Sequence, residues 1–324
     1  MDTVSDGDKS MAIRKPTPQW LVDIERYGLP LFILLAFVAL GLTDPAILLF
    51  VLAAAAVLAP SVIVHEWGHY IVARRRGLLV KEFSIGFGKR LWSRRSSKTG
   101  VLWSLKAIPL GGSVDVAGMT TEEVAKDGLA RDTAYIYASI WTRIRLTLAG
   151  VTMNVLLSWA TITAVVIATT AAHAPEAILL SPLVALTTLW TFLQGAASAL
   201  MWSAVNWNGG AGSILTLPES IQTGLHAATD GGMSPVVYFA FLVALVNLSL
   251  AIFNTLPLYP LDGYHAFVAG MDGIRNLSAR IRHQPRPEPL NKGQLANFTL
   301  ATGVLLASFV ILIFARDIFR MIFG

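Results

Sequence analysis

Residues 46–73 read AILLFVLAAAAVLAPSVIVHEWGHYIVA, an apolar stretch of 28 residues that is interrupted by His65, Glu66 and His69. A membrane-spanning helix needs about 20 apolar residues, so this stretch is long enough to cross a bilayer with some tilt. Ionisable side chains at membrane depth are costly unless they are paired or bind a metal. The stretch therefore predicts a membrane helix with a functional site inside it.

The three ionisable residues form the pattern H-E-x-x-H, and its spacing suits metal binding. Residues i and i+4 of a helix differ in direction by about 40°, so the imidazoles of His65 and His69 leave the same face and can bind one ion. Glu66 sits beside the first ligand, where its carboxylate can take a proton from a water at the metal. The alternative is that these three residues lie on a solvated helix face without binding a metal, which the apolar surroundings disfavour.

The composition supports a membrane protein with a nitrogen- and oxygen-lined metal site. Of the 324 residues, 54% are hydrophobic and only 14% are charged, and the mean hydropathy is +0.60. Soluble domains are about 45–50% apolar and about 25% charged, so this balance excludes most water-soluble enzymes. The absence of cysteine excludes disulfides, zinc–thiolate sites, iron–sulfur clusters and thiol nucleophiles.

A third metal ligand is expected from a distant part of the chain. A catalytic zinc takes three protein ligands and keeps a fourth position for water. Apart from tyrosines, Asp262 and His265 are the only ionisable residues in 231–271. We expect Asp262 to be the ligand, because a pair of prolines just before it breaks the helix, which is tolerated at this depth only beside protein or a wet cavity. The alternative is an Asp-Gly turn outside the membrane.

The rest of the chain divides by composition, and we expect an α-helical polytopic membrane protein with about five transmembrane helices. Three of them form a catalytic core, beside a small cytoplasmic membrane-associated antiparallel β-sheet. The expected parts are a cytoplasmic tail (1–28), an extra transmembrane or interfacial helix (29–45), core helices (46–73, 146–171 and 236–270), a cytoplasmic β-loop region (74–145), an outer-face segment with an amphipathic helix (172–235), a cytoplasmic loop (271–294) and a C-terminal helix (295–324).

The basic residues predict the orientation. If 29–43 crosses the membrane, 23 of the 25 Lys and Arg residues lie on one side; if it lies on the surface, the number is 19. The positive-inside rule assigns that side to the cytoplasm. The run Arg74-Arg75-Arg76 is typical of an anchor near anionic lipid, so we expect a lipid bilayer and no nucleic acid as partner.

Two distant motifs together resemble the site-2 protease family of intramembrane zinc metalloproteases. The early span has H-E-x-x-H, and residues 254–263 (NTLPLYPLDG) match the family pattern N-x-x-P-x-x-x-L-D-G. Residues 83–88 (FSIGFG) and 106–119 (KAIPLGGSVDVAGM) are similar to the cytoplasmic membrane-associated β-loop of bacterial members that cleave anti-sigma factors. The ending DVAGM looks like the actinobacterial branch. The resemblance covers roughly residues 46–160 and 180–315.

The resemblance implies one Zn²⁺ held by His65, His69 and Asp262, with Glu66 as the general base. It also implies a substrate-binding role for two asparagines and for glycines of the β-loop. Asn254 matches a family residue that helps to hold the substrate or the tetrahedral intermediate, although it could equally cap the broken helix. The other residues are Asn154, in a G-P-x-x-N element whose proline is replaced by Val151, and Gly86, Gly88, Gly111 and Gly112.

Bacterial relatives usually have PDZ modules on the outer face, but here only residues 172–181 separate the second core span from the amphipathic stretch, so we expect none. The resemblance implies an endopeptidase of the bacterial plasma membrane, active near its cytoplasmic side. Its substrates would be single-span membrane proteins such as anti-sigma factors or signal-peptide remnants. A metal carrier and a non-catalytic relative that binds membrane clients are the alternatives. The sequence leaves the oligomeric state open.

Overall fold

The structure is a computed structural model, and it describes residues 45–171, 174–205 and 217–323. The chain divides into two units, Met1–Leu48 and Leu49–Gly324, and nearly all described residues belong to the second. The predicted tail and the predicted helix over 29–43 lie outside the described residues.

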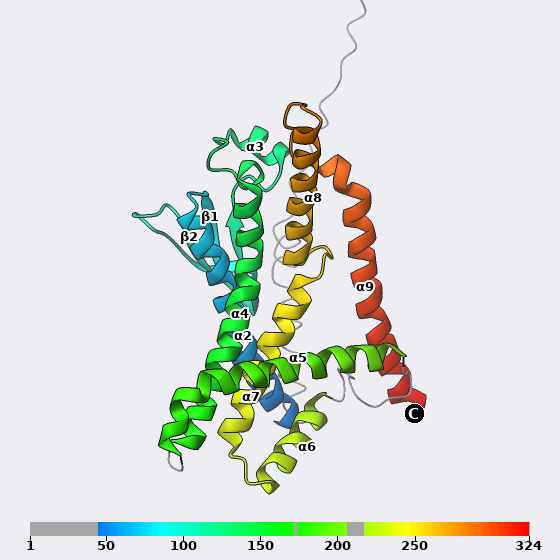
Figure 1. Ribbon diagram of the computed structural model, residues 1–324. Helices are drawn as coiled ribbons and strands as arrows, with labels where there is room; N and C mark the ends of the chain where they lie inside the picture. Colours follow the sequence, from blue (N-terminus) through cyan, green and yellow to red (C-terminus); the bar gives the residue numbers. More distant parts are fainter. Residues whose placement is uncertain (1–44, 172–173, 206–216, 324) are drawn as a thin grey trace, which may run out of the picture. The chain divides into compact units, whose positions relative to one another are not determined.

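The described part is mainly helical and has one small sheet, which confirms the expected fold class. The elements in chain order are α2 (Pro45–Arg75), β1 (Val80–Arg95), β2 (Leu102–Val116), α3 (Thr121–Asp127), η1 (Tyr135–Tyr137), α4 (Ile140–Thr170), η2 (Pro175–Leu180), α5 (Ser181–Val205), α6 (Leu217–Asp230), α7 (Pro235–Thr255), α8 (Asp262–Ile281) and α9 (Lys292–Phe323) (Figure 1). With 31 residues, α2 is about 46 Å long at 1.5 Å per residue, more than the thickness of a hydrocarbon core.

Four helical segments of the described residues are long and apolar enough to cross a membrane. They are Ile140–Thr170, Ile178–Gly195, Pro235–Thr255 and Lys292–Ile313. The second of these includes most of α5, the Trp-containing helix that we expected to lie along the outer face. Figure 1 shows α5 running across α4 rather than along it. The orientation of α5 in the bilayer stays a prediction.

Helix α4 packs against α5, α7 and α8. Its buried residues recur every three or four positions, as on one face of a helix, and include Leu146, Gly150, Asn154, Ser158 and Ile162. The Ser158 hydroxyl donates a 2.5 Å hydrogen bond to the carbonyl of Ala244 on α7. Small and polar residues of this kind let membrane helices approach closely.

The two strands form an antiparallel sheet that docks on α2. Residues 80–85 of β1 pair with residues 112–116 of β2, and Phe83 has both Val114 and Trp103 as partners. The rings of Phe83 and Trp103 pack against Trp67 and Tyr70 of α2, with centroids 5.3–6.1 Å apart. This aromatic cluster holds the sheet beside the turn of α2 that contains H-E-x-x-H.

The chain is not helical between α7 and α8, as the prolines at 257 and 260 predict. Residues 271–281, which we expected to be loop, are helical instead, because α8 continues to Ile281. Its buried Asp272 forms a 2.7 Å ion pair with the buried Arg143 of α4. The polar and basic residues of 271–293 predicted a loop, but the prolines of this stretch lie after the end of α8, and the charge of Asp272 is paired inside the protein.

Candidate metal centre

The first two candidate ligands come from one turn of α2. His65 is buried and His69 is half-buried, and their ring centroids are 4.8 Å apart. The two Nε2 atoms lie 3.1 Å from each other. The i, i+4 spacing therefore aims both imidazoles at one point, as the helical geometry requires.

The third candidate ligand comes from the start of α8. Asp262 is the first residue of that helix, directly after the non-helical residues 256–261. Its Oδ2 atom lies 2.9 Å from His65 Nε2 and 3.3 Å from His69 Nε2. These three residues form a group that could hold a metal ion, and His265 is not part of it.

The chemistry and the spacing of these atoms fit zinc. The Nδ1 atom of His69 lies 2.7 Å from the carbonyl oxygen of Leu146 and donates to it, which leaves Nε2 as an acceptor. One proton could bridge two of the three converging acceptors, but a cation satisfies all three. Ligands about 2.0–2.1 Å from a tetrahedral zinc are about 3.3–3.4 Å from one another, close to the observed 2.9–3.3 Å.

Glu66, beside His65 in the sequence, faces the sheet. Its carboxylate lies near the backbone of Val114 in β2. A Cβ atom added to Gly112 would lie 3.2 Å from Glu66 Cγ and 2.9 Å from the carbonyl oxygen of Ser84. The sheet edge formed by residues 112–116 therefore runs directly past the candidate base.

Residues 53–285 match the sequence profile described as peptidase family M50. This match covers more than half of the chain and includes every candidate ligand. The chain belongs to peptidase family M50.

The M50 chain is also similar to curated proteins from several bacteria. It is 45% identical over 95 residues to the zinc metalloprotease Rip1 of Mycobacterium tuberculosis, which is 29% of this chain and 22% of Rip1. It is 50% identical over 94 residues to a putative zinc metalloprotease of Xylella fastidiosa (29% and 20%). It is 43% identical over 91 residues to the regulator of sigma-E protease RseP of Escherichia coli (28% and 20%). The match thus spans about a fifth of the length of these relatives.

Helix α4 of the M50 chain forms the wall behind the histidines, a role that sequence reasoning missed. A Cβ atom added to Gly150 would lie 2.5 Å from Nε2 of both His65 and His69. One added to Gly68 of α2 would lie 2.6 Å from the carbonyl oxygen of Ala149. The sequence signal was present in the run Gly150-Val151-Thr152-Met153-Asn154, but we had drawn only Asn154 from it.

The two candidate asparagines have different surroundings. Asn154 is one turn beyond Gly150 on α4 and is fully buried, and neither atom of its amide has a hydrogen-bond partner among the described residues. A buried amide without partners costs about 1–3 kcal/mol per group, so the amide of Asn154 is an unusual feature of α4. Asn254 is half-buried in the last turn of α7.

The four candidate glycines lie in the sheet, where three of them have a backbone role. Gly86 and Gly88 have φ of 83° and Gly111 has φ of 103°, which is the left-handed region that favours glycine. Gly112 has no such requirement, but its backbone lies against Glu66. Of the four glycines, Gly112 is the one that lies next to Glu66 of the candidate metal centre.

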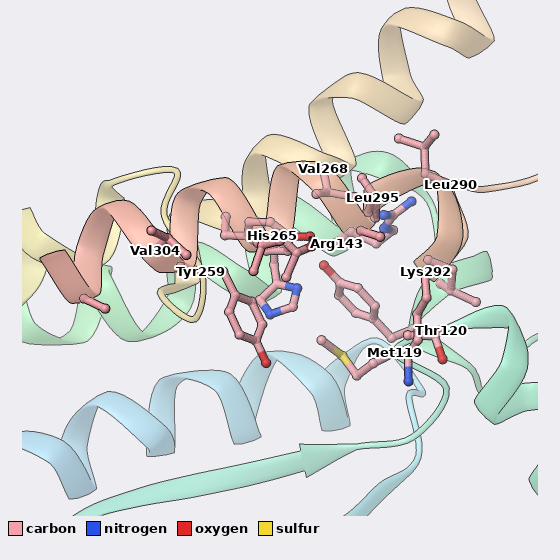
Figure 2. Close-up of a pocket in the computed structure, with 18 residues that line it drawn as sticks. Met119, Thr120, Arg143, Tyr259, His265, Val268, Leu290, Lys292, Leu295 and Val304 are labelled. Atoms are coloured by element: carbon pink, nitrogen blue, oxygen red, sulfur yellow. Dashed lines mark hydrogen bonds between the residues drawn. The ribbon is translucent and has the colours of Figure 1, made fainter.

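A cavity of about 810 Å³ lies between α8 and α9. His265, one turn after Asp262 on α8, points into it together with Tyr259 and Met119 (Figure 2). The wall on the side of α9 is formed by small and apolar residues: Leu295, Ala296, Leu300, Gly303, Val304 and Ala307. An apolar space between α8 and α9 therefore lies within one helical turn of Asp262, although none of the three candidate ligands lines it.

Proposed function

We propose that the protein is a zinc-dependent endopeptidase that cuts transmembrane segments of membrane proteins. One Zn²⁺ is held by His65, His69 and Asp262, and Glu66 is the general base. The observation that supports this most is the convergence of two imidazoles from α2 and one carboxylate from α8, beside a glutamate that faces a sheet edge.

The residues of the centre divide the work of peptide hydrolysis. Zinc, when bound, supplies Lewis-acid polarisation of the scissile carbonyl and acidifies water. Glu66 takes the proton of the attacking water on its carboxylate and passes it to the leaving amine. The Leu146 carbonyl fixes the orientation of the His69 ring.

The substrate binds to the sheet edge in an extended form. A transmembrane helix satisfies all its amides internally, so it must unwind locally before it is cut. Residues 112–116 pair with β1 on one side only among the described residues. An unwound segment that pairs with the other side would lie next to Glu66, and backbone pairing tolerates many sequences.

Two further parts of the site receive the unwound segment. The unpartnered amide of Asn154 hydrogen-bonds the substrate backbone, which removes the cost of burying that amide. Asn254, at the end of α7, is the second candidate for this task. The cavity beside His265 accommodates the apolar side chains that the unwound segment exposes.

We further propose that the substrates are single-span proteins of the bacterial plasma membrane, such as anti-sigma factors or signal-peptide remnants. The name of RseP connects that protein with the regulation of sigma-E, which favours the first of these. The concentration of Lys and Arg residues on one side supports a site near the cytoplasm.

The variant Glu66→Gln tests the proposed function, with the exposed Glu288→Gln as the matched control. Glu66→Gln keeps the ligands, so it retains zinc but accumulates uncut membrane stubs in quantitative proteomics, whereas Glu288→Gln does not. Cleavage by Glu66→Gln at the wild-type rate would contradict the role of the base. Zinc flux through vesicles without any proteolysis would instead support the metal carrier.

A further inference from the structure

A second cavity lies between α2 and α4, close to the basic ends of both helices. Its volume is about 380 Å³. Three arginines line it together with apolar and small residues: Arg75, Arg76, Arg145, Gly68, Ile71, Val72, Ala149, Thr152 and Met153. The lining contains no acidic residue, so the cavity combines an apolar floor with a positively charged mouth.

No described residue supplies a counter-charge to the three arginines. All three are exposed, and none of them forms an ion pair within the described part of the chain. Arg143, on the same helix as Arg145, is instead 2% exposed and paired with Asp272. Like charges that share one cavity repel each other, so an anion bound there would relieve that repulsion.

The dipole of α4 does not stabilise the positive charge of Arg145. Arg75 ends α2, where the negative end of the dipole favours a cation. Arg145 lies in the second turn of α4, near the positive end of that helix. An external anion that bridges the two helices would satisfy both side chains.

The surroundings of the cavity are those of a membrane interface. Trp141, one turn before Arg145 on α4, is 69% exposed, and exposed tryptophans favour the level of the lipid headgroups. In the opposite direction, Leu156 follows Thr152 by one turn and is also exposed. An apolar strip on α4 therefore leads away from the charged mouth toward the membrane interior.

We propose that this cavity binds one anionic phospholipid, with its phosphate between Arg75, Arg76 and Arg145 and its acyl chains along the exposed face of α4. Basic pockets between membrane helices are suited to such headgroups. The lipid would connect α2 and α4 at the contact of Gly68 with Ala149, next to the wall that Gly150 forms behind the histidines. The proposal does not depend on the proteolytic activity.

Native mass spectrometry of the full-length protein tests this proposal. The probe is phosphatidylglycerol, added to protein in phosphatidylcholine nanodiscs. The test variant replaces Arg75, Arg76 and Arg145 by Gln, and the control variant removes the same charge elsewhere, at Arg280, Arg282 and Arg286. We expect one retained phosphatidylglycerol in the wild type and the control, and binding weaker by on the order of 100-fold in the test variant.

A second variant separates lipid binding from folding and from charge alone. Thr152→Trp fills the cavity and keeps all three arginines, and it should also lose the retained lipid. Equal retention in the wild type and the Gln variant, equal loss in the control, or full retention in Thr152→Trp would overturn the proposal. Displacement of phosphatidylglycerol by inorganic phosphate at the same concentration would overturn it too, because the site would then recognise a soluble anion.

Discussion

Gly150 on α4 lies against His65 on α2 so closely that even a methyl group would not fit between them. The added Cβ atom would lie 2.5 Å from both Cε1 and Nε2 of His65. The position of the imidazole pair therefore depends on the absence of a side chain on a helix that contributes no ligand.

Gly150→Ala should weaken zinc binding by about 10- to 100-fold, the range seen when residues that orient metal ligands are changed. The methyl group must push one or both imidazoles away from their common point. Zinc affinity measured by competition with a chelator checks this. Gly195→Ala on α5 is the control, because an added Cβ there meets nothing within 4 Å; equal affinities for the two variants would contradict the argument.

Gly112→Val should reduce cleavage while zinc binding stays at the wild-type level. Its side chain would start 3.2 Å from Glu66 Cγ and would also intrude on the edge to which the substrate is proposed to add. Zinc content and the accumulation of uncut membrane stubs are measured together. A variant that loses zinc, or that cuts normally, would show that Gly112 does not act through the base and the edge.

Asp272→Ala should destabilise the protein by about 3–5 kcal/mol, because it leaves the guanidinium of Arg143 buried without a partner. The same change also removes the acceptor for the backbone amide of Leu290. Thermal unfolding in detergent measures the loss. The double variant Arg143→Met with Asp272→Leu should recover most of it, and a single variant as stable as the wild type would contradict the role of the pair.

Glu82 in the sheet should make stability depend on acidity. Hydrogen bonds from Arg90 at 2.5 and 3.1 Å lower the pKa of Glu82 from 4.5 to about 2. Since the pKa is lower in the folded chain than in the unfolded chain, the stabilisation is complete above about pH 4.5 and is lost as the pH falls toward 2. Unfolding midpoints of wild type and Glu82→Gln should therefore converge over that window; a constant difference would be the contrary result.

The sequence alone predicted the parts of the centre that depend on local pattern. The helical spacing of H-E-x-x-H predicts that His65 and His69 share a face, and the structure places their Nε2 atoms 3.1 Å apart. Asp262 could be chosen because ionisable residues are rare in that part of the chain, and the family resemblance favoured the same residue.

The remaining features depend on contacts between distant residues, which no local pattern reveals. Gly150 matters because it has no side chain and so leaves room for the imidazoles, and the hydrophobic periodicity of the sequence does not reveal such a role. The stretch 271–281 was expected to be loop because residues 271–293 are polar, basic and contain prolines; the structure makes it part of α8, with Asp272 paired to Arg143, 129 positions away. The cavity beside His265 is formed by residues of α8 and α9 together, so it cannot be predicted without the relative positions of these helices.

X-ray absorption at the zinc edge of the purified full-length protein, compared with Asp262→Ala, tests the central claim most directly. The account predicts two imidazole nitrogens at about 2.0–2.1 Å with oxygen ligands at about 2.0–2.2 Å in the wild type. In Asp262→Ala the carboxylate oxygen should disappear while both imidazoles stay. Identical spectra for the two proteins, or a single imidazole in the wild type, would contradict the account.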